Sequence, residues 1–585
     1  MLNKIISVIM SFAISLTGMV YSSINDMIDA VSEFIFGIPC SIEAIKDDFF
    51  SDIDASDIET VDEDKGFVND KIAVFLNPDI SFSEKLSFFN SIDGTLVGWS
   101  APADLYVLDY DEMTFENVMS ECERIYENEN VELAVPVTAF KYSSNKTPVD
   151  DFGYPDISGE WDELNPEGRN WWLEAIDARQ AWDYEKYFSR IDIGVVDAGF
   201  DVDHNDLNGK IYFPDSKQAG RNRQNPHGCH VAGIIGANHN SSGIAGICNN
   251  SRLICVDWEP ELLQLWISDL EIYFALSTLV ESGAKVINFS LGTSGTKHGN
   301  SSNLWERLIT PAAYSYTMSS LLAKGYDFVA VQSAGNGDAD GNPIDAKYNG
   351  SFTTINKNNV FTGSNNVSAD DILNRIIIVG SVDNNGDGTY TQSFFSNVGS
   401  TISVSAPGES IYSCSIDGGY EYLSGTSMSA PIVTGVASLV WSVNPSFTGA
   451  DVKDIIHTST DSVAEIYTRL PYAYDVELEE YPVVNAKLAV EEAIRRTDSS
   501  VGTVSGKITK NAAEIVCDGV SHTVFSDGTF SFVSSAGTST AQVLDSSGNI
   551  VGSFALSISA GETVDIGEII FEQSIPATNS DAVKE

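Results

Sequence analysis

Basic residues are scarce in this chain. Its 585 residues include 32 Lys and Arg against 83 Asp and Glu, a formal net charge of −51 at pH 7. A surface this acidic repels phosphate groups, so the composition argues against a nucleic acid as partner. The 43% of hydrophobic residues and the nine Trp indicate sizeable packed cores. A chain of this length is expected to form about three or four domains.

Cysteine is also sparse, and no two cysteines form a CxxC pair. The seven are dispersed and odd in number, which indicates neither a disulfide framework nor a zinc cluster. A pair between Cys248 and Cys255 and a set of buried free thiols are both compatible with the spacing. The seven are Cys40, Cys122, Cys229, Cys248, Cys255, Cys414 and Cys517.

Long apolar runs are absent except at the amino terminus. Residues 1–22 combine Lys4 with an apolar stretch at 5–20 and small side chains near Ser22. This arrangement predicts a signal peptide, against the alternatives of a buried helix or a membrane anchor. We therefore expect a secreted, extracellular protein with no membrane anchor after signal removal.

Residues 71–142 carry the pattern of a small α+β unit. "KIAVFLN", "LVGWSA", "DLYVLDY" and "VELAVPV" are typical of strands, whereas "FSEKLSFFNSI" and "FENVMSECERIYEN" have helical spacing. The predicted order is β-α-β-β-α-β, a ferredoxin-like arrangement. Residues 143–168, rich in Asp, Pro, Gly and Ser, are expected to be a linker or a surface segment.

Residues 169–497 alternate between apolar strands and helical patterns. Strands such as "RIDIGVVDAG", "AKVINFSLG" and "RIIIVGSV" are apolar almost throughout, which is typical of strands buried on both faces. The fold class predicted for this region is α/β, with a parallel sheet covered by helices on both faces. Functional sites in such sheets lie at the carboxyl ends of the strands.

Residues 501–573 change to short alternating strands with turn residues between them. This pattern predicts a small all-β sandwich. Its segment "DGTFSF" resembles a turn and strand of carboxypeptidase regulatory-like modules.

Three residues of the α/β region have the chemistry of nucleophilic catalysis. Asp197 directly follows an apolar strand in "IGVVDAG", His227 opens the helical pattern "HGCHVAGIIGA", and Ser427 precedes another in "GTSMSAPIVTG". Serine is a poor nucleophile at neutral pH and needs a base, which in turn needs an orienting carboxylate. Taken singly, each residue is more simply a cap, a turn or a loop residue.

These motifs, in the order Asp, His, Ser, resemble the subtilisin-like serine proteases, or subtilases. The resemblance extends over about residues 165–496. It implies that Asp197 orients His227, and that His227 takes the proton of Ser427 as an acyl-enzyme forms. It also implies that residues 71–142 are an inhibitor-like pro-domain that the enzyme itself removes. Tyr142 is the candidate processing site, and the linker up to Gly168 contains other candidates.

Further residues acquire expected roles from the same resemblance. Asn336 in "SAGN" matches the oxyanion-hole asparagine. Ser290, Leu291 and Gly292 in "NFSLG" match the strand that lines the substrate cleft, where a peptide would add as an extra strand. Ala198 stands where many members have Ser or Thr, so the support of the Asp197 carboxylate is expected to be weaker.

Two neighbours of His227 suggest other chemistry. His230 forms an HxxH pair with it, as in some zinc sites, but no HExxH glutamate accompanies them, and the resemblance implies a structural histidine. Cys229 stands where the family more often has threonine. We expect a small buried residue, with a second nucleophile beside the base as the alternative.

A candidate structural calcium site is the remaining expectation. The resemblance aligns the calcium loop of the family with "NHNSSGIAGI", whose oxygens would act together with Asp206. The candidate metal ligands are Asp206, Asn238, Asn240, Ser242 and Ile244. The segment "DNNGDG" at 383–388 imitates an EF-hand loop without its glutamate, and a hairpin or loop turn is expected instead.

The function predicted is therefore that of a secreted serine endopeptidase made as a proenzyme, with no cofactor required for its chemistry. Its expected partners are protein or peptide substrates and its own pro-domain. Two alternatives stay open at this point. One is a dedicated processing protease for one exported peptide, and the other is a catalytically silent binding protein on the same fold.

Overall fold

The structure, a computed structural model, describes most of the chain after the first fifty residues. It covers residues 53, 55–62, 65–141, 170–214, 225–257, 266–292, 309–338, 341–385, 388–465, 481–508, 512–525 and 527–570. The predicted signal peptide and the predicted linker at 143–168 lie outside these residues.

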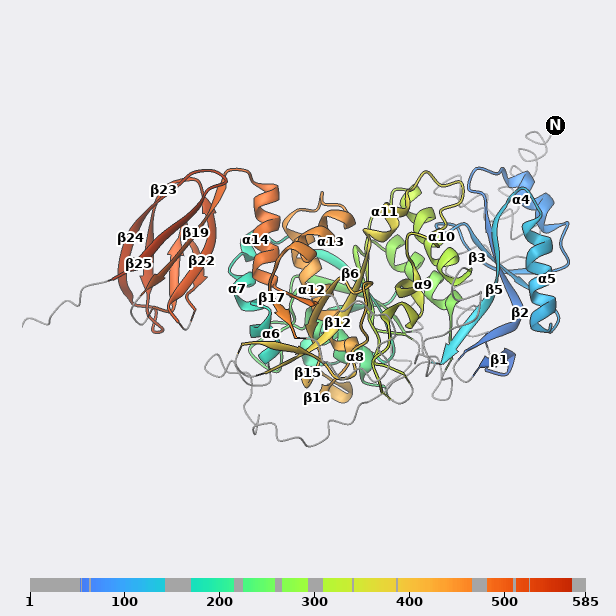
Figure 1. The fold of residues 1–585 in the computed structure, drawn as a ribbon, viewed down its shortest axis with the longest axis horizontal. Coiled ribbons are helices and arrows are strands. Elements are labelled where there is room, and N and C mark those ends of the chain that lie inside the picture. Colours follow the sequence, from blue (N-terminus) through green and yellow to red (C-terminus); the bar gives the residue numbers. More distant parts are fainter. Residues whose placement is uncertain are drawn as a thin grey trace, which may run out of the picture.

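A six-stranded sheet forms the amino-terminal end of the molecule (Figure 1). Its path runs β3-β4-β2-β5-β9, with β1 paired to β2. From β2 to β5 the order along the chain is β-α-β-β-α-β. The elements are β1 (Ile58–Asp62), β2 (Lys65–Leu76), α4 (Phe82–Phe89), β3 (Thr95–Ser100), β4 (Leu105–Asp109), α5 (Phe115–Tyr126), β5 (Val131–Lys141) and β9 (Trp266–Ser268).

The strand β2 begins at Lys65, before the predicted start at Lys71. Its pairing with β5 shifts register between Phe67 and Ile72. The polar residues of "VNDK" occupy this irregular stretch. They interrupt the apolar alternation, and this interruption hid the first half of the strand from the sequence pattern.

The two faces of this sheet pack into two different apolar cores. Helices α4 and α5 cover one face, where Ile72, Val74 and Leu108 are buried. On the other face Phe75 and Val135 belong to the same apolar cluster as helices of the central region. The amino-terminal unit is therefore packed on the central region through a continuous core.

A ten-stranded sheet forms the central region, with the path β17-β18-β14-β12-β11-β10-β6-β8-β7 and β13 paired to β12. The pairs from β7 to β18 along this path are parallel, whereas β17 and β13 add antiparallel. The predicted parallel α/β architecture is confirmed. The strands are β6 (Ile191–Asp197), β7 (Ile211–Tyr212), β8 (Ser251–Asp257), β10 (Val286–Phe289), β11 (Val329–Ser333), β12 (Ile376–Asn384), β13 (Tyr390–Gln392), β14 (Val404–Pro407), β17 (Thr460–Ala464) and β18 (Tyr481–Val484).

Helices cover both faces of this sheet because its strands alternate between two apolar clusters. Val195 of β6 and Val286 of β10 face the cluster of α8, α12 and α14, whereas Val196 and Ile287 face that of α9, α10 and α11. The helices are α6 (Trp171–Ala175), α7 (Ala178–Trp182), α8 (His227–Gly236), α9 (Asp269–Glu281), α10 (Thr310–Ala323), α11 (Ala369–Leu373), α12 (Thr426–Val443), α13 (Gly449–Thr458) and α14 (Ala486–Thr497).

Helix α12 runs through the centre of this core. Among the described residues it is the one helix whose length and apolar composition would suit a membrane span, and 89% of that stretch is buried inside the protein. Its hydrophobicity is explained by its position between α8, α14 and the sheet.

A separate two-stranded hairpin precedes α12 and was not predicted. It consists of β15 (Ile411–Cys414) and β16 (Tyr420–Leu423), paired antiparallel. The segment "DNNGDG" also leads into a hairpin, since β12 pairs antiparallel with β13 across it. The short 3₁₀ helices are η1 (Ala55–Asp57), η2 (Glu185–Tyr187), η3 (Asn205–Leu207), η6 (Ala346–Tyr348), η7 (Ser351–Thr354) and η8 (Ile416–Gly418).

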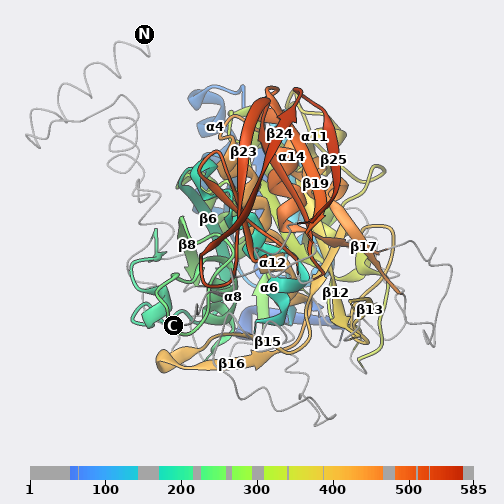
Figure 2. The ribbon, with the colours of Figure 1, turned by 90° about the vertical axis from the view of Figure 1, so that its left-hand side faces the viewer.

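Two facing sheets form the carboxyl-terminal end, seen in front in Figure 2. One has the order β22-β19-β25 and the other β21-β20-β23-β24. Phe532 and Val504 of the first sheet meet Ile515 and Val543 of the second in one core. The strands are β19 (Val501–Ile508), β20 (Glu514–Cys517), β21 (Val520–Thr523), β22 (Thr529–Ser535), β23 (Gly537–Leu544), β24 (Ile550–Ile558) and β25 (Thr563–Ile569).

This carboxyl-terminal unit is docked firmly against the central region. Val501 and Val533 are buried in the apolar cluster of α12 and α14. The Tyr184 hydroxyl donates to the Glu491 carboxylate at 2.7 Å and accepts from the Val533 N–H at 2.9 Å. Apolar contacts and hydrogen bonds together hold the two units in one orientation.

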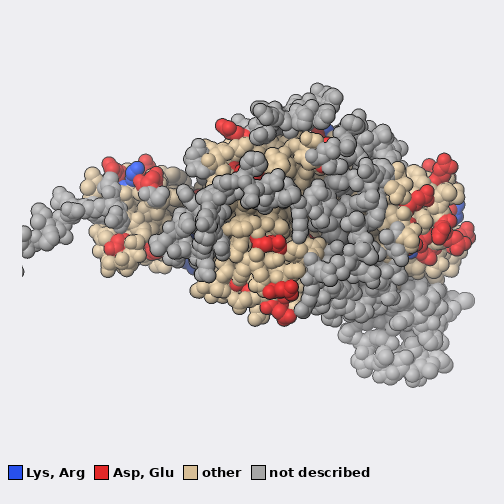
Figure 3. All heavy atoms as spheres, turned by 90° about the horizontal axis from the view of Figure 1, so that it is seen from below, with Lys and Arg blue, Asp and Glu red and all other residues tan. Residues whose placement is uncertain are grey.

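The acidic composition is visible on the surface. In Figure 3, Asp and Glu gather at the amino-terminal end and in smaller patches over the central region, with few Lys or Arg among them. This distribution agrees with a protein kept soluble by its net negative charge.

The docking generates a prediction for Tyr184. We expect Tyr184→Phe to lower the free energy of unfolding by about 1–3 kcal/mol, because the Val533 N–H is left buried without an acceptor. The half-buried Tyr187, replaced by Phe, is the matched control, for which we expect little change. Urea denaturation measures both, and equal unfolding midpoints for Tyr184→Phe and the wild type would contradict the prediction.

Candidate active site

Asp197 and His227 meet where the carboxyl end of β6 faces the amino end of α8. The Asp197 Oδ1 lies 2.6 Å from His227 Nδ1, and Asp197 is 1% exposed. A carboxylate oxygen can only accept, so Nδ1 carries the proton of this hydrogen bond, and in the neutral ring Nε2 is then the basic nitrogen. The His227 side chain is 14% exposed, which leaves part of the ring open to solvent.

Ala198 supports this carboxylate through its backbone. Its N–H donates to Asp197 Oδ1 at 2.7 Å. The other oxygen, Oδ2, is buried and has no hydrogen-bond partner among the described residues. A hydroxyl at position 198 is not available to reach it, in keeping with the weaker support expected from the sequence.

Ser427 is the second residue of α12 and is held there by an irregularity of the helix. A regular helix would bond the Ser427 carbonyl to the N–H of residue 431, but that residue is Pro431 and has no N–H. The Ser290 hydroxyl supplies the missing donor at 2.8 Å. The Ser427 hydroxyl in turn lies 3.4 Å from the Ser290 carbonyl oxygen. Two contacts therefore connect α12 to the segment after β10.

Asn336 follows β11, and Thr426 determines the orientation of its carboxamide. Asn336 Oδ1 accepts from the Thr426 N–H at 2.9 Å and from the Thr426 hydroxyl at 2.8 Å. The Thr426 N–H requires an acceptor, so the oxygen of the Asn336 carboxamide faces Thr426. The amide nitrogen Nδ2 therefore points away from Thr426. Nδ2 lies beside Gly425, 3.2 Å from where a Cβ on that residue would be. The side-chain donor is thus presented next to Ser427.

His230 is completely buried and joins α8 to the hairpin of β15 and β16. Its Nε2 lies 2.9 Å from the Ile411 oxygen and 3.2 Å from the Glu421 oxygen, so it donates to these carbonyls. Burial lowers the pKa of His230 to about 3, and the ring is neutral at physiological pH. This geometry favours the structural interpretation over a zinc ligand.

Cys229 is also enclosed. Its side chain is 0% exposed and its thiol donates to the Ser415 carbonyl oxygen at 3.2 Å. Burial raises the pKa of the thiol to about 12, so it is protonated at neutral pH. A buried protonated thiol is a poor nucleophile, which favours the small buried residue over a second reactive group.

Three of the candidate calcium ligands, Asp206, Asn238 and Asn240, accept hydrogen bonds from neighbouring donors, and the calcium site stays a prediction. Asp206 Oδ1 accepts from Asn240 Nδ2 at 2.9 Å, whereas Oδ2 accepts from the Ile244 N–H at 3.0 Å and the Tyr420 hydroxyl at 2.8 Å. The Asn240 oxygen accepts from the Ser242 N–H, and the Asn238 oxygen from the Asn240 N–H. Calcium requires six or more oxygens directed at one centre, and these oxygens face donors instead.

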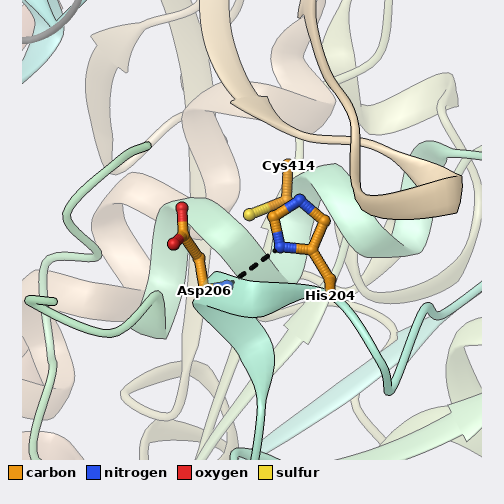
Figure 4. A group of neighbouring side chains, drawn as sticks. All are labelled: His204, Asp206 and Cys414. Carbon is orange, nitrogen blue, oxygen red and sulfur yellow. Dashed lines mark hydrogen bonds between the residues drawn. The ribbon is translucent and has the colours of Figure 1, made fainter. Parts of the chain in front are cut away.

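A neighbouring group of His204, Asp206 and Cys414 does not fit a metal. Figure 4 shows the three side chains together, with His204 Nδ1 turned to the Asp206 N–H at 3.1 Å. The other ring nitrogen donates to the Gly419 carbonyl at 2.9 Å. Burial raises the pKa of the Cys414 thiol well above its usual value. Both ring nitrogens are engaged and the thiol is neutral, so no free ligand set exists here.

Phe140 of β5 is opposite Ile267 of β9 in an antiparallel register, and β9 leads directly into α9. Sequence patterns missed the roles of Thr426 and Tyr420, because each depends on a partner far away in the chain. The missing N–H of Pro431 explains the contact of the Ser427 carbonyl with Ser290.

Comparison with known proteins identifies the family. Residues 189–547, well over half of the chain, match the model of the subtilase family. The chain belongs to the subtilase family. It is a serine-type endopeptidase, whose substrates are proteins, and the chemistry of subtilases needs no cofactor.

Several relatives show how far the similarity extends. This subtilase is 28% identical over 466 residues to the thermophilic serine proteinase of Bacillus sp. (strain AK1), covering 78% of this chain and 97% of that protein. It is 31% identical over 302 residues to thermitase of Thermoactinomyces vulgaris, covering 51% of this chain and 90% of thermitase. The crystal structure of fervidolysin from Fervidobacterium pennivorans aligns with a TM-score of 0.49 at 20% identity, over 87% of this chain and 79% of that one.

The Asp206 cluster generates a prediction about calcium. We expect Tyr420→Phe to lower the free energy of unfolding by about 1–3 kcal/mol, because a buried carboxylate oxygen loses a donor. Added calcium is expected not to restore it. Urea denaturation with a chelator and with calcium measures both effects, and Tyr126→Phe at an exposed position is the control. A rise in wild-type stability with calcium that Asp206→Asn abolishes would contradict the prediction.

Proposed function

We propose that Asp197, His227 and Ser427 form the catalytic triad of this endopeptidase. The observation that carries the proposal is the 2.6 Å bond between Asp197 Oδ1 and His227 Nδ1, which leaves Nε2 as the basic nitrogen. Ser427 supplies a hydroxyl at the amino end of a buried helix. All three residues lie at the edge of the sheet where the parallel strands end.

In the proposed reaction, Ser427 Oγ attacks the carbonyl carbon of the scissile bond while His227 Nε2 takes its proton. The imidazolium is stabilised by Asp197, and the carbonyl oxygen becomes an oxyanion. Asn336 Nδ2 and the Ser427 N–H donate to that oxyanion. His227 then protonates the leaving amine, and water hydrolyses the acyl-enzyme by the reverse transfers.

The amino-terminal unit is proposed to act as an intramolecular inhibitor. Its strand β5 adds to β9 as an extended peptide substrate would, through main-chain hydrogen bonds. Lys324 after α10 donates to the Asp104 carboxylate at 2.6 Å and to the Ala101 carbonyl at 2.6 Å. These contacts, with the shared apolar core, support residues 71–142 as the pro-domain.

Maturation and export complete the proposal. The chain after Lys141 leads from the inhibitor strand toward the candidate processing site Tyr142, which lies outside the described residues. The predicted signal peptide at 1–22 lies outside them as well, so secretion rests on the sequence pattern. A peptide would bind along Ser290–Gly292 through its backbone, and such binding suits many protein sequences.

A fluorophosphonate probe tests the nucleophile. We expect the matured wild type to be labelled and Ser427→Ala to remain unlabelled and unprocessed, as seen by amino-terminal sequencing. Ser429→Ala on the same helix is the matched control and should label like the wild type. Equal labelling of Ser427→Ala and the wild type would overturn the assignment of Ser427.

A second measurement tests the oxyanion donor. In subtilisin, loss of one such donor lowers kcat by about 10²–10³-fold, and we expect the same of Asn336→Ala. The KM for a peptide substrate should change little, because the donor acts on the transition state. Steady-state kinetics with active-site titration gives both constants. A kcat within about twofold of the wild type would exclude this role.

A further inference from the structure

Asn349 lies between the two glycines that follow neighbouring strands at the proposed site. Gly292 follows β10, and Gly335 follows β11. A Cβ placed on Gly292 would lie 2.3 Å from the Asn349 carboxamide, and one placed on Gly335 would lie 2.3 Å from Asn349 Oδ1. The carboxamide therefore packs directly against both backbones, in a space that only two glycines leave open.

The orientation of this carboxamide is determined by one hydrogen bond. Asn349 Nδ2 donates to the Ser333 carbonyl oxygen at 3.0 Å, so Oδ1 faces the opposite way. Oδ1 is buried without a hydrogen-bond partner among the described residues, and Asn349 is 1% exposed. A buried acceptor without a donor is costly and uncommon, so it calls for an explanation.

Gln332 has a second buried carboxamide, whose nitrogen donates a hydrogen bond while its oxygen has no partner in the described part of the chain. Gln332 Nε2 donates to the Leu291 carbonyl oxygen at 3.2 Å, and its Oε1 also has no partner among the described residues. The region between the segments after β10 and β11 thus holds two acceptors and no spare donor from these two side chains. A ligand group that enters here would be matched best if it donated a hydrogen bond.

The proposed reacting groups lie next to this region. Ser427 Oγ lies 3.4 Å from the Ser290 carbonyl oxygen, next to Leu291 and Gly292. Asn336, which would face the substrate carbonyl oxygen, directly follows Gly335. In the proposed complex, the residue whose carbonyl is attacked between Ser427 and Asn336 directs its side chain between the two glycine segments, toward Asn349.

Resting on the proposed function, we propose that Asn349 forms the floor of the subsite for the residue before the scissile bond and restricts it to small side chains, with serine preferred. A large side chain would have to displace a carboxamide held between two backbones. An alanine side chain needs less room than a large side chain. A serine side chain needs little more room than alanine, and its hydroxyl can donate a hydrogen bond to Asn349 Oδ1. The substrate class is thus proteins cut after small residues.

The sequence after the inhibitor strand agrees with this preference. The pairing of β5 with β9 ends at Lys141, opposite Trp266. The next residues in the sequence are Tyr142, Ser143 and Ser144. A subsite for small residues selects one of the two serines as the processing site, in place of Tyr142.

The test uses the matured full-length enzyme and peptides that differ only in the residue before the scissile bond. We expect kcat/KM for serine to exceed that for phenylalanine or leucine by at least about 100-fold. Serine should exceed alanine by about 5–10-fold, because the hydroxyl gains a hydrogen bond. Equal or better cleavage after phenylalanine or leucine would overturn the proposal.

The variant Asn349→Gly tests the residue itself. We expect its kcat/KM for the phenylalanine peptide to rise at least about 10-fold, and the serine-to-alanine ratio to fall to about 1. Asn365→Gly is the matched control, because Asn365 is a buried asparagine bonded to Ser319 and Ser320 of α10, and its profile should equal the wild type. A wild-type profile in Asn349→Gly would assign the preference to other residues and overturn the proposal.

Labelling by the fluorophosphonate separates this inference from the proposed function. An unlabelled wild type would refute the triad and with it the subsite, whereas a labelled wild type that prefers large residues refutes the subsite alone. If Asn349→Gly fails to label, the milder variant Asn349→Ser takes its place, and the wild-type profile still decides the size preference.

Discussion

The hydrogen bond between Asp197 and His227 is the contact around which the site is arranged. It joins the end of a central strand to the start of a buried helix, and both are surrounded by apolar side chains. The ring can keep this orientation only while α8 keeps its place. His230, one helical turn later, maintains that place by donating to two carbonyls of the β15–β16 hairpin. The hairpin continues directly into α12, so the elements that hold His227 and Ser427 are physically connected.

Buried polar groups in this region bind one another where an ion was expected. The Asp206 carboxylate accepts hydrogen bonds from one backbone N–H, one side-chain amide and one hydroxyl. Tyr420, which supplies the hydroxyl, comes from the same hairpin that receives His230. One short hairpin thus contacts the loop after β6, helix α8 and the start of α12. Its rigidity is a condition for the geometry of all three.

The sequence predicted well those parts of the structure that depend on local pattern. Apolar strands followed by turn residues located β6, β8, β10, β11 and β12, and the motifs around Asp197 and His227 lie at the predicted end of one strand and start of one helix. The parts that it missed depend on partners distant along the chain. The calcium site stays a prediction, and the sequence pattern did not reveal that the hydroxyl of Tyr420 reaches Asp206 across more than two hundred residues. Asn349 carries no motif at all, and its position appears only once the ends of β10 and β11 are side by side.

The docking of the carboxyl-terminal sandwich has a consequence for biosynthesis. Val501 and Val533 belong to the core that also holds α12 and α14, and Tyr184 near the start of the central region bonds to the backbone of Val533. A ribosome synthesises this unit after the whole central region. Until the sandwich is made, the central core lacks two apolar residues. The Tyr184 hydroxyl also lacks the hydrogen bond that it accepts from the Val533 N–H. The final packing of the central core therefore depends on the sandwich, and a chain truncated after α14 would expose an apolar surface of that core.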